Sequence, residues 1–192
     1  MNVSYIVNKV FSSRTYILLN KANSVIWLVD CGDVDSILAR FSSYDIKGVL
    51  LTHTHYDHIY GLPHLAMNYP HLTIFTNTFG KKALSSSKLN MSKYHDDPIS
   101  IESDNVVICD EGTEIELYDG IMAKVYYTPG HNPSCLTYEI GEYLFTGDAY
   151  IPDVPVVTIL PGGNKSQAKE SETRILSLAE EKIICPGHEI TM

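Results

Sequence analysis

The hydrophobic residues of the chain fall into short apolar runs, separated by polar turns and a few segments of helical spacing. Runs rich in β-branched and aromatic residues are typical of strands. In the first half of the chain they predict strands at residues 5–11, 15–19, 25–29, 46–51 and 72–75. In the second half they predict strands at residues 106–109, 114–117, 122–127, 135–140, 143–145 and 182–185.

Helical spacing interrupts the strands in both halves. Val34, Ile37 and Phe41 recur at intervals of three and four residues, and helices are also predicted at residues 62–69, 78–84 and 166–179. The segments 85–98 and 151–161 show no clear period and are predicted to be loops that carry substrate specificity. Because strands followed by helices occur twice, the pattern predicts two sheets packed face to face with helices outside, an αββα sandwich.

Composition and charge narrow the possible partners. With 192 residues, 44% of them hydrophobic and 19% charged, the chain is expected to fold as one globular domain over residues 1–192. A net charge of −9 argues against nucleic acid, which binds lysine and arginine, and favours a small-molecule substrate. No apolar run approaches the roughly 18 residues of a membrane span, and no signal peptide is evident. We therefore expect a cytoplasmic location and no membrane partner.

Four potential metal ligands occur together directly after the strand predicted at 46–51. They are His53, His55, Asp57 and His58, and they include three of the eight histidines of the chain. In an extended segment His53, His55 and Asp57 project to one side, whereas His58 requires a turn. The spacing therefore suits two neighbouring metal ions better than one. Imidazole and carboxylate ligands are appropriate for zinc, iron or manganese.

Three later residues share a second pattern, in which an apolar strand and a tight glycine turn precede a lone histidine or aspartate. They are His131, Asp148 and His188. Glycine allows the backbone to turn sharply and to approach a metal closely. Ligands placed at strand ends are held by a rigid core. Together with the histidine cluster, this pattern predicts a metal site.

These motifs resemble those of the metallo-β-lactamase-fold hydrolase superfamily over essentially the whole chain. The matching positions are Asp30, His53, His55, Asp57, His58, His131, Asp148 and His188. The resemblance implies an αββα sandwich with a binuclear site. One metal would be bound by His53, His55 and His131, and the other by Asp57, His58 and His188. Asp148 would bridge both ions, and Asp30 would support the loop that carries the ligands.

The implied chemistry is hydrolysis. Two divalent ions, zinc or alternatively iron or manganese, would acidify a bridging water to hydroxide at neutral pH. That hydroxide would cleave an ester, thioester or lactone of a small molecule, and the metals would stabilise the developing oxyanion. Tyr150 lies shortly after Asp148, where lactonase relatives place a tyrosine, and is a candidate catalytic residue that donates a hydrogen bond to the substrate carbonyl. His64, His71 and His95 fit no spacing and are expected to be surface or loop residues.

Differences from the motifs of particular branches of the superfamily indicate which branches the chain resembles most. Asp148 fits the glyoxalase II, lactonase and phosphodiesterase branches, whereas β-lactamases generally carry cysteine or another residue there. His55 occupies a position that flavodiiron oxygen reductases fill with glutamate. The motifs resemble glyoxalase II, but that enzyme has a further C-terminal helical domain, and this chain ends four residues after His188. Glutathione thioesters are therefore not expected as substrates.

Three alternative functions stay open. A persulfide dioxygenase would use a single iron held by two histidines and an aspartate, here His53, His131 and Asp148. A β-lactamase or phosphodiesterase would use the same binuclear site on a different bond. A non-catalytic module would bind or sense metal without turnover. No motif identifies the substrate or the oligomeric state.

Overall fold

The chain forms two β-sheets, which the computed structural model describes over residues 1–20, 22, 24–102 and 104–189. The first sheet has the order β1-β2-β3-β4-β5-β6 and the second has the order β11-β10-β9-β8-β7. The strands of the first sheet are β1 (Asn2–Val7), β2 (Arg14–Asn20), β3 (Val25–Val29), β4 (Asp45–Leu50), β5 (Thr73–Thr76) and β6 (Val106–Ile108). Those of the second are β7 (Glu114–Tyr118), β8 (Ile121–Tyr127), β9 (Leu136–Ile140), β10 (Tyr143–Gly147) and β11 (Ile183–Pro186).

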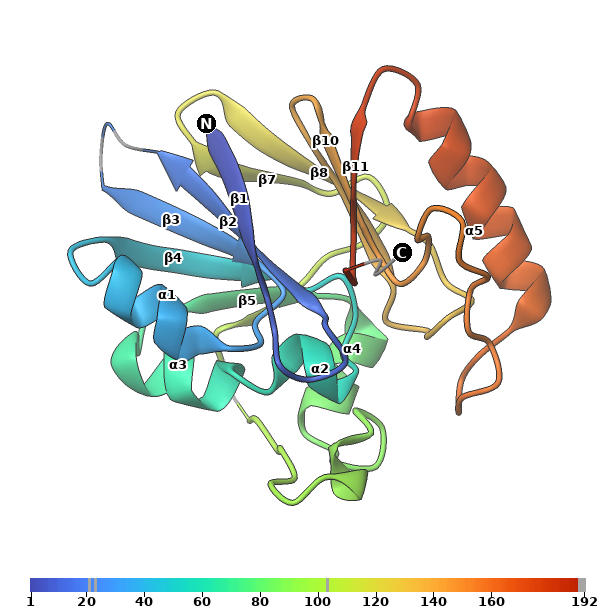
Figure 1. Ribbon diagram of the computed structural model, residues 1–192, viewed down its shortest axis with the longest axis horizontal. Helices are drawn as coiled ribbons and strands as arrows, with labels where there is room; N and C mark the ends of the chain where they lie inside the picture. Colours follow the sequence, from blue (N-terminus) through green and yellow to red (C-terminus); the bar gives the residue numbers. More distant parts are fainter. Residues whose placement is uncertain (21, 23, 103, 190–192) are drawn as a thin grey trace.

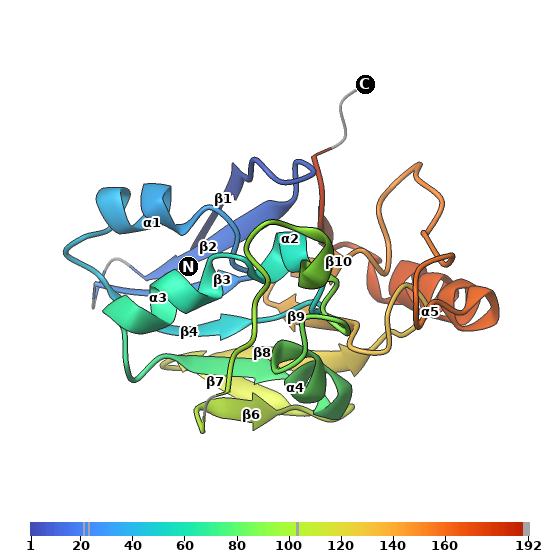
Figure 2. The same ribbon diagram turned by 90° about the horizontal axis from the view of Figure 1, so that it is seen from below.

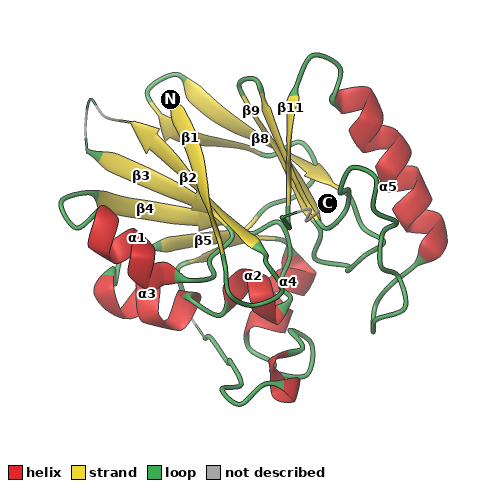
Figure 3. Ribbon diagram, viewed as in Figure 1, coloured by secondary structure: helices red, strands yellow, loops and turns green. Residues whose placement is uncertain are grey.

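Helices connect the parallel strands and cover the outer faces of the sheets. They are α1 (Val34–Arg40), α2 (Tyr56–Ile59), α3 (Leu62–Asn68), α4 (Thr78–Leu84), the 3₁₀ helix η1 (Ser92–Tyr94) and α5 (Lys165–Leu178). Strands β3 to β6 run parallel, as do β10 and β11, and a parallel pair needs a crossover connection. Helices α1 and α3 lie outside the first sheet and α5 lies outside the second (Figure 1; Figure 3). The predicted four-layer αββα sandwich is therefore confirmed.

Alternation along the central strands divides the core into layers. In β3, Ile26 and Leu28 pack into the cluster that joins the first sheet to its helices. Trp27 and Val29 point the other way, into the cluster between the two sheets. A third and smaller cluster, which includes Ile175, packs α5 against the second sheet. Strands buried on both faces explain why the sequence shows continuous apolar runs.

Buried polar groups tie the two sheets together. The Trp27 indole Nε1 donates a hydrogen bond of 2.9 Å to the carbonyl oxygen of Leu117 in the second sheet. The hydroxyl of Tyr138, also in the second sheet, donates at 3.0 Å to the carbonyl oxygen of Leu51, just before the histidine cluster. Because buried polar groups need partners, these contacts help to define how the sheets sit relative to each other.

The first strand differs from its prediction. Residues 5–11 were predicted to be extended, but β1 ends at Val7 and the chain turns over residues 8–13. Asn8 Nδ2 donates to Ser13 Oγ at 3.0 Å, and such local side-chain bonds compete with sheet pairing. Phe11 and Ser12 adopt the left-handed conformation, with φ of 53° and 55°. The apolar side chain of Phe11 therefore lies on an exposed turn and not on a strand.

The other predicted elements agree with the structure to within a few residues. The strand at 25–29 and the helix at 78–84 match β3 and α4 residue for residue, and the helix at 166–179 corresponds to α5. The segment 85–98 is a loop interrupted by η1; it projects beyond α2 and α4 in Figure 1 and passes in front of α2 in Figure 2. None of the helices in the described part of the chain combines the length and hydrophobicity needed to span a bilayer.

Candidate metal centre

The seven predicted metal ligands come from both sheets and meet at one end of the sandwich. The chain leaves β4 extended through His53 and His55, and then turns into α2, which begins at Tyr56 and carries Asp57 and His58. Because the chain turns into α2, the side chain of His58 can lie near those of His53 and Asp57, as the sequence pattern required. The remaining three follow strands of the second sheet, and they are His131 after β8, Asp148 after β10 and His188 after β11.

The donor atoms form three groups, of which two are separate and the third, His53, His58 and Asp148, overlaps both. The first group comprises His53, His55 and His131, and the second comprises Asp57, His58 and His188. The Asp148 carboxylate lies 3.2 Å from His188 Nε2 and 3.5 Å from both His131 Nε2 and His58 Nε2. It lies 3.9 Å from His53 Nε2. The first and second groups have the same members as the two predicted ligand sets, and Asp148 lies between them.

The environment of the donor atoms fits metal ions. His53 Nε2 and Asp148 Oδ1 are buried and have no hydrogen-bond partner among the described residues. The ring nitrogens His55 Nδ1 and His131 Nε2 face each other at 2.9 Å. Buried polar atoms without partners are costly, and a cation satisfies several lone pairs at once. The nitrogen and oxygen donors suit zinc or a similar divalent ion.

Backbone carbonyl groups determine which nitrogen faces the centre in two of the histidines. His131 Nδ1 donates to the carbonyl oxygen of Val157 at 2.8 Å. His188 Nδ1 donates to the carbonyl oxygen of Phe11 at 2.9 Å. A proton held on Nδ1 leaves the Nε2 lone pair available to a metal. The turn at 8–13 and the loop at 151–161 therefore orient ligands that lie far from them in the sequence.

The Asp30 carboxylate orients His58 in the same way, by accepting a hydrogen bond from its Nδ1. The side chain of Asp30 is buried, with Oδ1 accepting from the Thr52 backbone N–H at 2.8 Å and Oδ2 accepting from Thr52 Oγ1 at 2.7 Å. His58 Nδ1 donates to the same Oδ2 at 2.8 Å. Asp30 has φ of 60°, a conformation that aspartate tolerates better than most residues. The structure thus places Asp30 where it supports both the ligand loop and one ligand.

The electrostatics of the site favour a bound cation. Burial lowers the pKa of His55 to about 4, and burial together with the nearby His58 lowers the pKa of His53 well below its usual value. Both rings are therefore neutral at pH 7, with lone pairs available. Burial opposes the charged form of His58 too, but carboxylates that include Asp57 and Asp148 raise its pKa well above the usual value. Their negative potential stabilises positive charge at this point, whether a proton or a metal ion carries it.

Glycine is required at two of the ligand turns. Gly147 has φ of 52°, and a Cβ atom there would lie 2.4 Å from Thr52 Oγ1. A Cβ atom on Gly187 would lie 2.2 Å from Asp148 Oδ1. The absence of a side chain at Gly147 lets the loops of the two sheets come into contact, and its absence at Gly187 leaves room for the Asp148 carboxylate.

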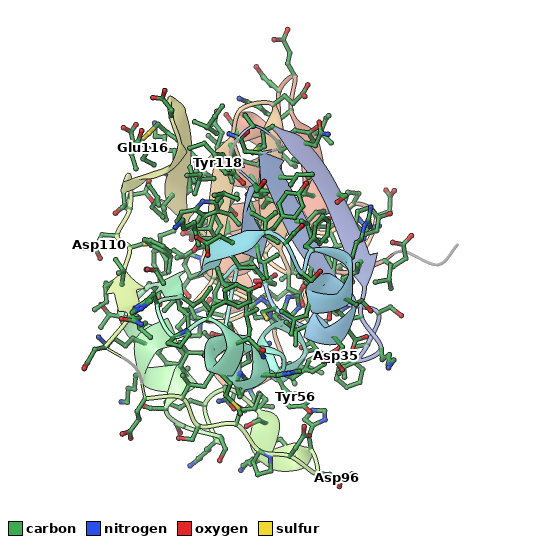
Figure 4. The ribbon with its side chains drawn as sticks, turned by 90° about the vertical axis from the view of Figure 1, so that its left-hand side faces the viewer. Asp35, Tyr56, Asp96, Asp110, Glu116 and Tyr118 are labelled. Carbon is green, nitrogen blue, oxygen red and sulfur yellow. The ribbon has the colours of Figure 1, made fainter. Side chains whose placement is uncertain are left out.

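A cleft of about 370 Å³ lies over the donor atoms. Its lining includes five of the predicted ligands, and the other residues are Phe11, Tyr56, Met91, Tyr94, His95, Val157 and Leu160. Both loops in which specificity was expected, 85–98 and 151–161, contribute to it. His95 was expected to be an ordinary loop residue, but it stacks on Tyr56 with ring centroids 3.8 Å apart. Figure 4 shows Tyr56 next to this loop, with Asp96 near its tip.

Tyr150 lies elsewhere. It packs against the small cluster that contains Leu144 and Ile175, and it lines a separate cavity of about 600 Å³ between residues 151–158 and α5. It is not one of the described residues that line the cleft. Its catalytic role stays a prediction, and this placement does not support it.

Two polar residues beside His131 were missed by the sequence reasoning. Asn132 Nδ2 lies 2.9 Å from His55 Nε2, and Asn132 Oδ1 accepts from Ser134 Oγ at 2.6 Å. Ser134 Oγ in turn accepts from the Thr54 backbone N–H at 3.0 Å. They connect the loops of the two sheets around one ligand. Their position just after the predicted ligand His131 was the sequence signal from which they could have been identified.

An αββα sandwich with histidine and aspartate donors at the common edge of its sheets defines a class of metal-dependent hydrolases. The chain belongs to the metallo-β-lactamase superfamily, whose sequence profile matches residues 11–188. Cluster and family together indicate a site for divalent metal ions.

Comparisons with individual proteins show more distant similarity. The chain is 28% identical over 182 residues to a hydroxyacylglutathione hydrolase of Hamiltonella defensa, covering 91% of this chain and 62% of that protein. It is 27% identical over 198 residues to a probable metallo-hydrolase of Streptococcus pyogenes, covering 98% and 81%. The crystal structure of the BLEG-1 B3 metallo-β-lactamase shares the fold, with a TM-score of 0.86, 23% identity and coverage of 98% and 92%. The chain spans 57% to 62% of hydroxyacylglutathione hydrolases that it matches.

Proposed function

We propose that the protein is a binuclear zinc hydrolase that cleaves an ester, thioester or lactone of a small molecule. The observation that carries this proposal is the position of Asp148, whose carboxylate lies within 3.9 Å of histidines from both donor groups. A carboxylate has two oxygens, so it can contact two metal ions at once. The similarity to hydroxyacylglutathione hydrolase, a hydrolase by name, supports the same reaction type.

The residues of the chain have distinct parts in this reaction. When bound, two divalent ions supply the Lewis acidity that turns water into a nucleophile at neutral pH and stabilises negative charge on a substrate oxygen. Asp30 and the carbonyl groups of Phe11 and Val157 hold protons on the Nδ1 atoms of three histidines, so that each Nε2 is free to bind. Apolar residues beside the donor atoms make the surroundings of the site less polar, which strengthens electrostatic interactions there.

A small neutral molecule is the proposed partner. The net charge of −9 disfavours polyanions such as nucleic acid, and it gives no attraction to anionic lipid surfaces. The cleft of about 370 Å³ falls within the size range of small-molecule sites.

Metal analysis combined with a substrate panel tests the proposed function. Protein purified without chelators should contain two zinc ions per chain and hydrolyse at least one member of a panel of thioesters, esters, lactones, β-lactams and phosphodiesters. One iron per chain with oxidation of persulfides would support the dioxygenase alternative instead. Metal-loaded protein that turns over no member of the panel would overturn the hydrolase proposal.

Replacement of His131 tests the ligand assignment. His131→Ala should remove one metal ion and lower kcat/KM by more than the roughly 10–100-fold typical of outer hydrogen-bond partners. His71→Ala, an exposed histidine outside the cluster, is the matched control and should retain both metals and full activity. Unchanged turnover in His131→Ala would contradict the assignment.

A further inference from the structure

Apolar side chains from three separate segments converge on the cleft above the candidate ligands. Phe11 comes from the turn at 8–13, Met91 and Tyr94 come from the loop around η1, and Val157 and Leu160 come from the loop before α5. No single stretch of sequence contains this grouping. The residues that line the cleft beyond the ligands are therefore mainly apolar or aromatic.

Two of these side chains are unusually exposed for their size. Phe11 is 69% exposed and Tyr94 is 66% exposed. Single exposed apolar residues are common, but several gathered around one cleft mark a ligand-binding surface. Phe11 is also tied to the reactive centre, because its carbonyl oxygen holds His188 Nδ1. A ligand group that covers these side chains would therefore lie close to the metals.

Away from the candidate metal ligands, the described lining of the cleft contributes no charged donor to an anionic ligand. Among its described lining residues there is no lysine or arginine. The neighbouring cations have other contacts, since Lys93 Nζ lies over the Tyr94 ring at 4.6 Å and Arg14 pairs with Glu189 at 2.6 Å. A carboxylate or phosphate placed against the apolar side chains, away from the metals, would lose its hydration without gaining a partner from them. An uncharged apolar group gains by transfer out of water.

Aromatic rings limit the shape of the group that fits. The His95 ring stacks on Tyr56 with an interplanar angle of 16°, and the Phe11 ring lies 6.1 Å from His95. The volume of about 370 Å³ is near the lower end of small-molecule clefts, which run from about 300 to 1,000 Å³. The space therefore suits a medium-length chain or a single ring.

We propose that the substrate carries an uncharged, apolar acyl group of medium length, which binds against Phe11, Tyr94 and Leu160 while its carbonyl faces the metals. This inference rests on the proposed hydrolase function and adds the chemical class of the substrate. It predicts that neutral aliphatic or aromatic acyl esters and thioesters are preferred over anionic ones, including thioesters of glutathione.

Binding of hydroxamic acids tests the inference without relying on turnover, because the hydroxamate group binds metal and its chain mimics the acyl group. Calorimetry on zinc-loaded protein would compare acetohydroxamate, butyrohydroxamate, hexanohydroxamate and the anionic succinic monohydroxamate. Affinity should rise about fourfold per buried methylene from acetohydroxamate to hexanohydroxamate. Succinic monohydroxamate should bind at least tenfold more weakly than butyrohydroxamate, its neutral counterpart. A flat dependence on chain length, or tighter binding of the anionic compound, would overturn the inference.

Variants locate the binding surface. Leu160→Ala should lower the affinity ratio of hexanohydroxamate to acetohydroxamate about fivefold, and the exposed Tyr94→Ala provides a second test if Leu160→Ala folds poorly. Ile159→Ala is the matched control, since Ile159 is 92% exposed and does not line the cleft. Its ratio should equal that of the unchanged protein. Unaltered ratios in both Leu160→Ala and Tyr94→Ala would contradict the assigned surface.

Hydrolysis of the matching 4-nitrophenyl esters separates the two proposals. If the hydroxamates bind as expected but no ester, thioester, lactone or other member of the substrate panel is hydrolysed, the proposed function is overturned and the proposed apolar acyl site is supported. If acetate and hexanoate esters are hydrolysed with equal kcat/KM and the hydroxamates bind equally, the hydrolase function is supported and the proposed preference for an apolar acyl group is overturned.

Discussion

The Asp30 carboxylate accepts three hydrogen bonds, two from Thr52 and one from His58. The contacts to Thr52 hold the start of the ligand loop against the end of β3. The contact to His58 holds a proton on Nδ1 and leaves Nε2 facing Asp57 and Asp148. At the scale of single residues, the site therefore depends on side chains that touch the ligands as well as on the ligands themselves.

Asp30→Asn tests this dependence. Asparagine has one acceptor oxygen in place of two, so its amide N–H₂ would face Thr52 Oγ1 and His58 Nδ1. His58 would then move its proton to Nε2 or turn, and metal affinity should fall by about 10–100-fold. Competition with a chromophoric chelator measures this affinity. Asp33→Asn, in the same turn but bonded to the Lys9 backbone N–H at 2.9 Å, should change it little. Equal affinity in Asp30→Asn and the unchanged protein would contradict the role assigned to Asp30.

At the scale of elements, a shared geometry at strand ends brings the ligands of the second sheet together. β10 and β11 are parallel neighbours, and Gly187 donates from its backbone N–H to the Gly147 carbonyl oxygen at 3.0 Å. The residues that follow, Asp148 and His188, therefore leave adjacent strands at the same end of the sheet.

Gly187→Ala should damage the site more than the fold. The new Cβ atom would lie 2.2 Å from Asp148 Oδ1 and 3.0 Å from His58 Cε1, so the central carboxylate must move. We expect loss of at least one metal ion and roughly 100-fold lower activity, by analogy with ligand-supporting contacts. Metal analysis would measure the loss of ions from the site, and circular dichroism would show whether the fold is retained. Gly141→Ala, where a Cβ atom meets nothing within 4 Å, should keep both metals despite backbone strain at φ of 60°. Full metal content in Gly187→Ala would contradict this prediction.

In the molecule as a whole, the candidate metal site joins the two sheets. His53, His55, Asp57 and His58 follow a strand of the first sheet, whereas the other three ligands follow strands of the second. The site is thus a point of contact between layers that otherwise meet through apolar packing and a few buried hydrogen bonds. Metal binding is expected to stabilise the packing of one sheet on the other.

Removal of the metals should therefore lower the melting temperature. A ligand present at 100 times its Kd stabilises the folded state by about 2.7 kcal/mol. At about 2–4 °C per kcal/mol for a chain of this size, the loss corresponds to roughly 5–10 °C. Differential scanning calorimetry with and without a chelator measures the shift, and restoring zinc should reverse it. A melting temperature that does not respond to the chelator would show that the sheets are held without metal.

Most of the secondary-structure elements and all of the candidate ligands could be predicted from the sequence, because both depend on local properties. Short apolar runs rich in β-branched and aromatic residues predicted the strands, and the spacing of His53, His55, Asp57 and His58 suited two neighbouring metals better than one. A lone ligand after a glycine turn identified His131 and the two that follow it along the chain. In each case the signal lies within a few neighbouring residues, and the family resemblance supplied the order in which they combine.

The surroundings of the candidate ligands could not be predicted from the sequence and follow from the packing of the folded chain. This packing placed Phe11 beside His188 across 177 positions of sequence, brought His95 into the cleft and moved Tyr150 to a different cavity. The apolar residue Phe11 extends a strand pattern when it is read locally, yet it lies on an exposed turn over the site. Such contacts depend on how two sheets pack, and packing is set by residues far apart in the chain, which no local pattern encodes.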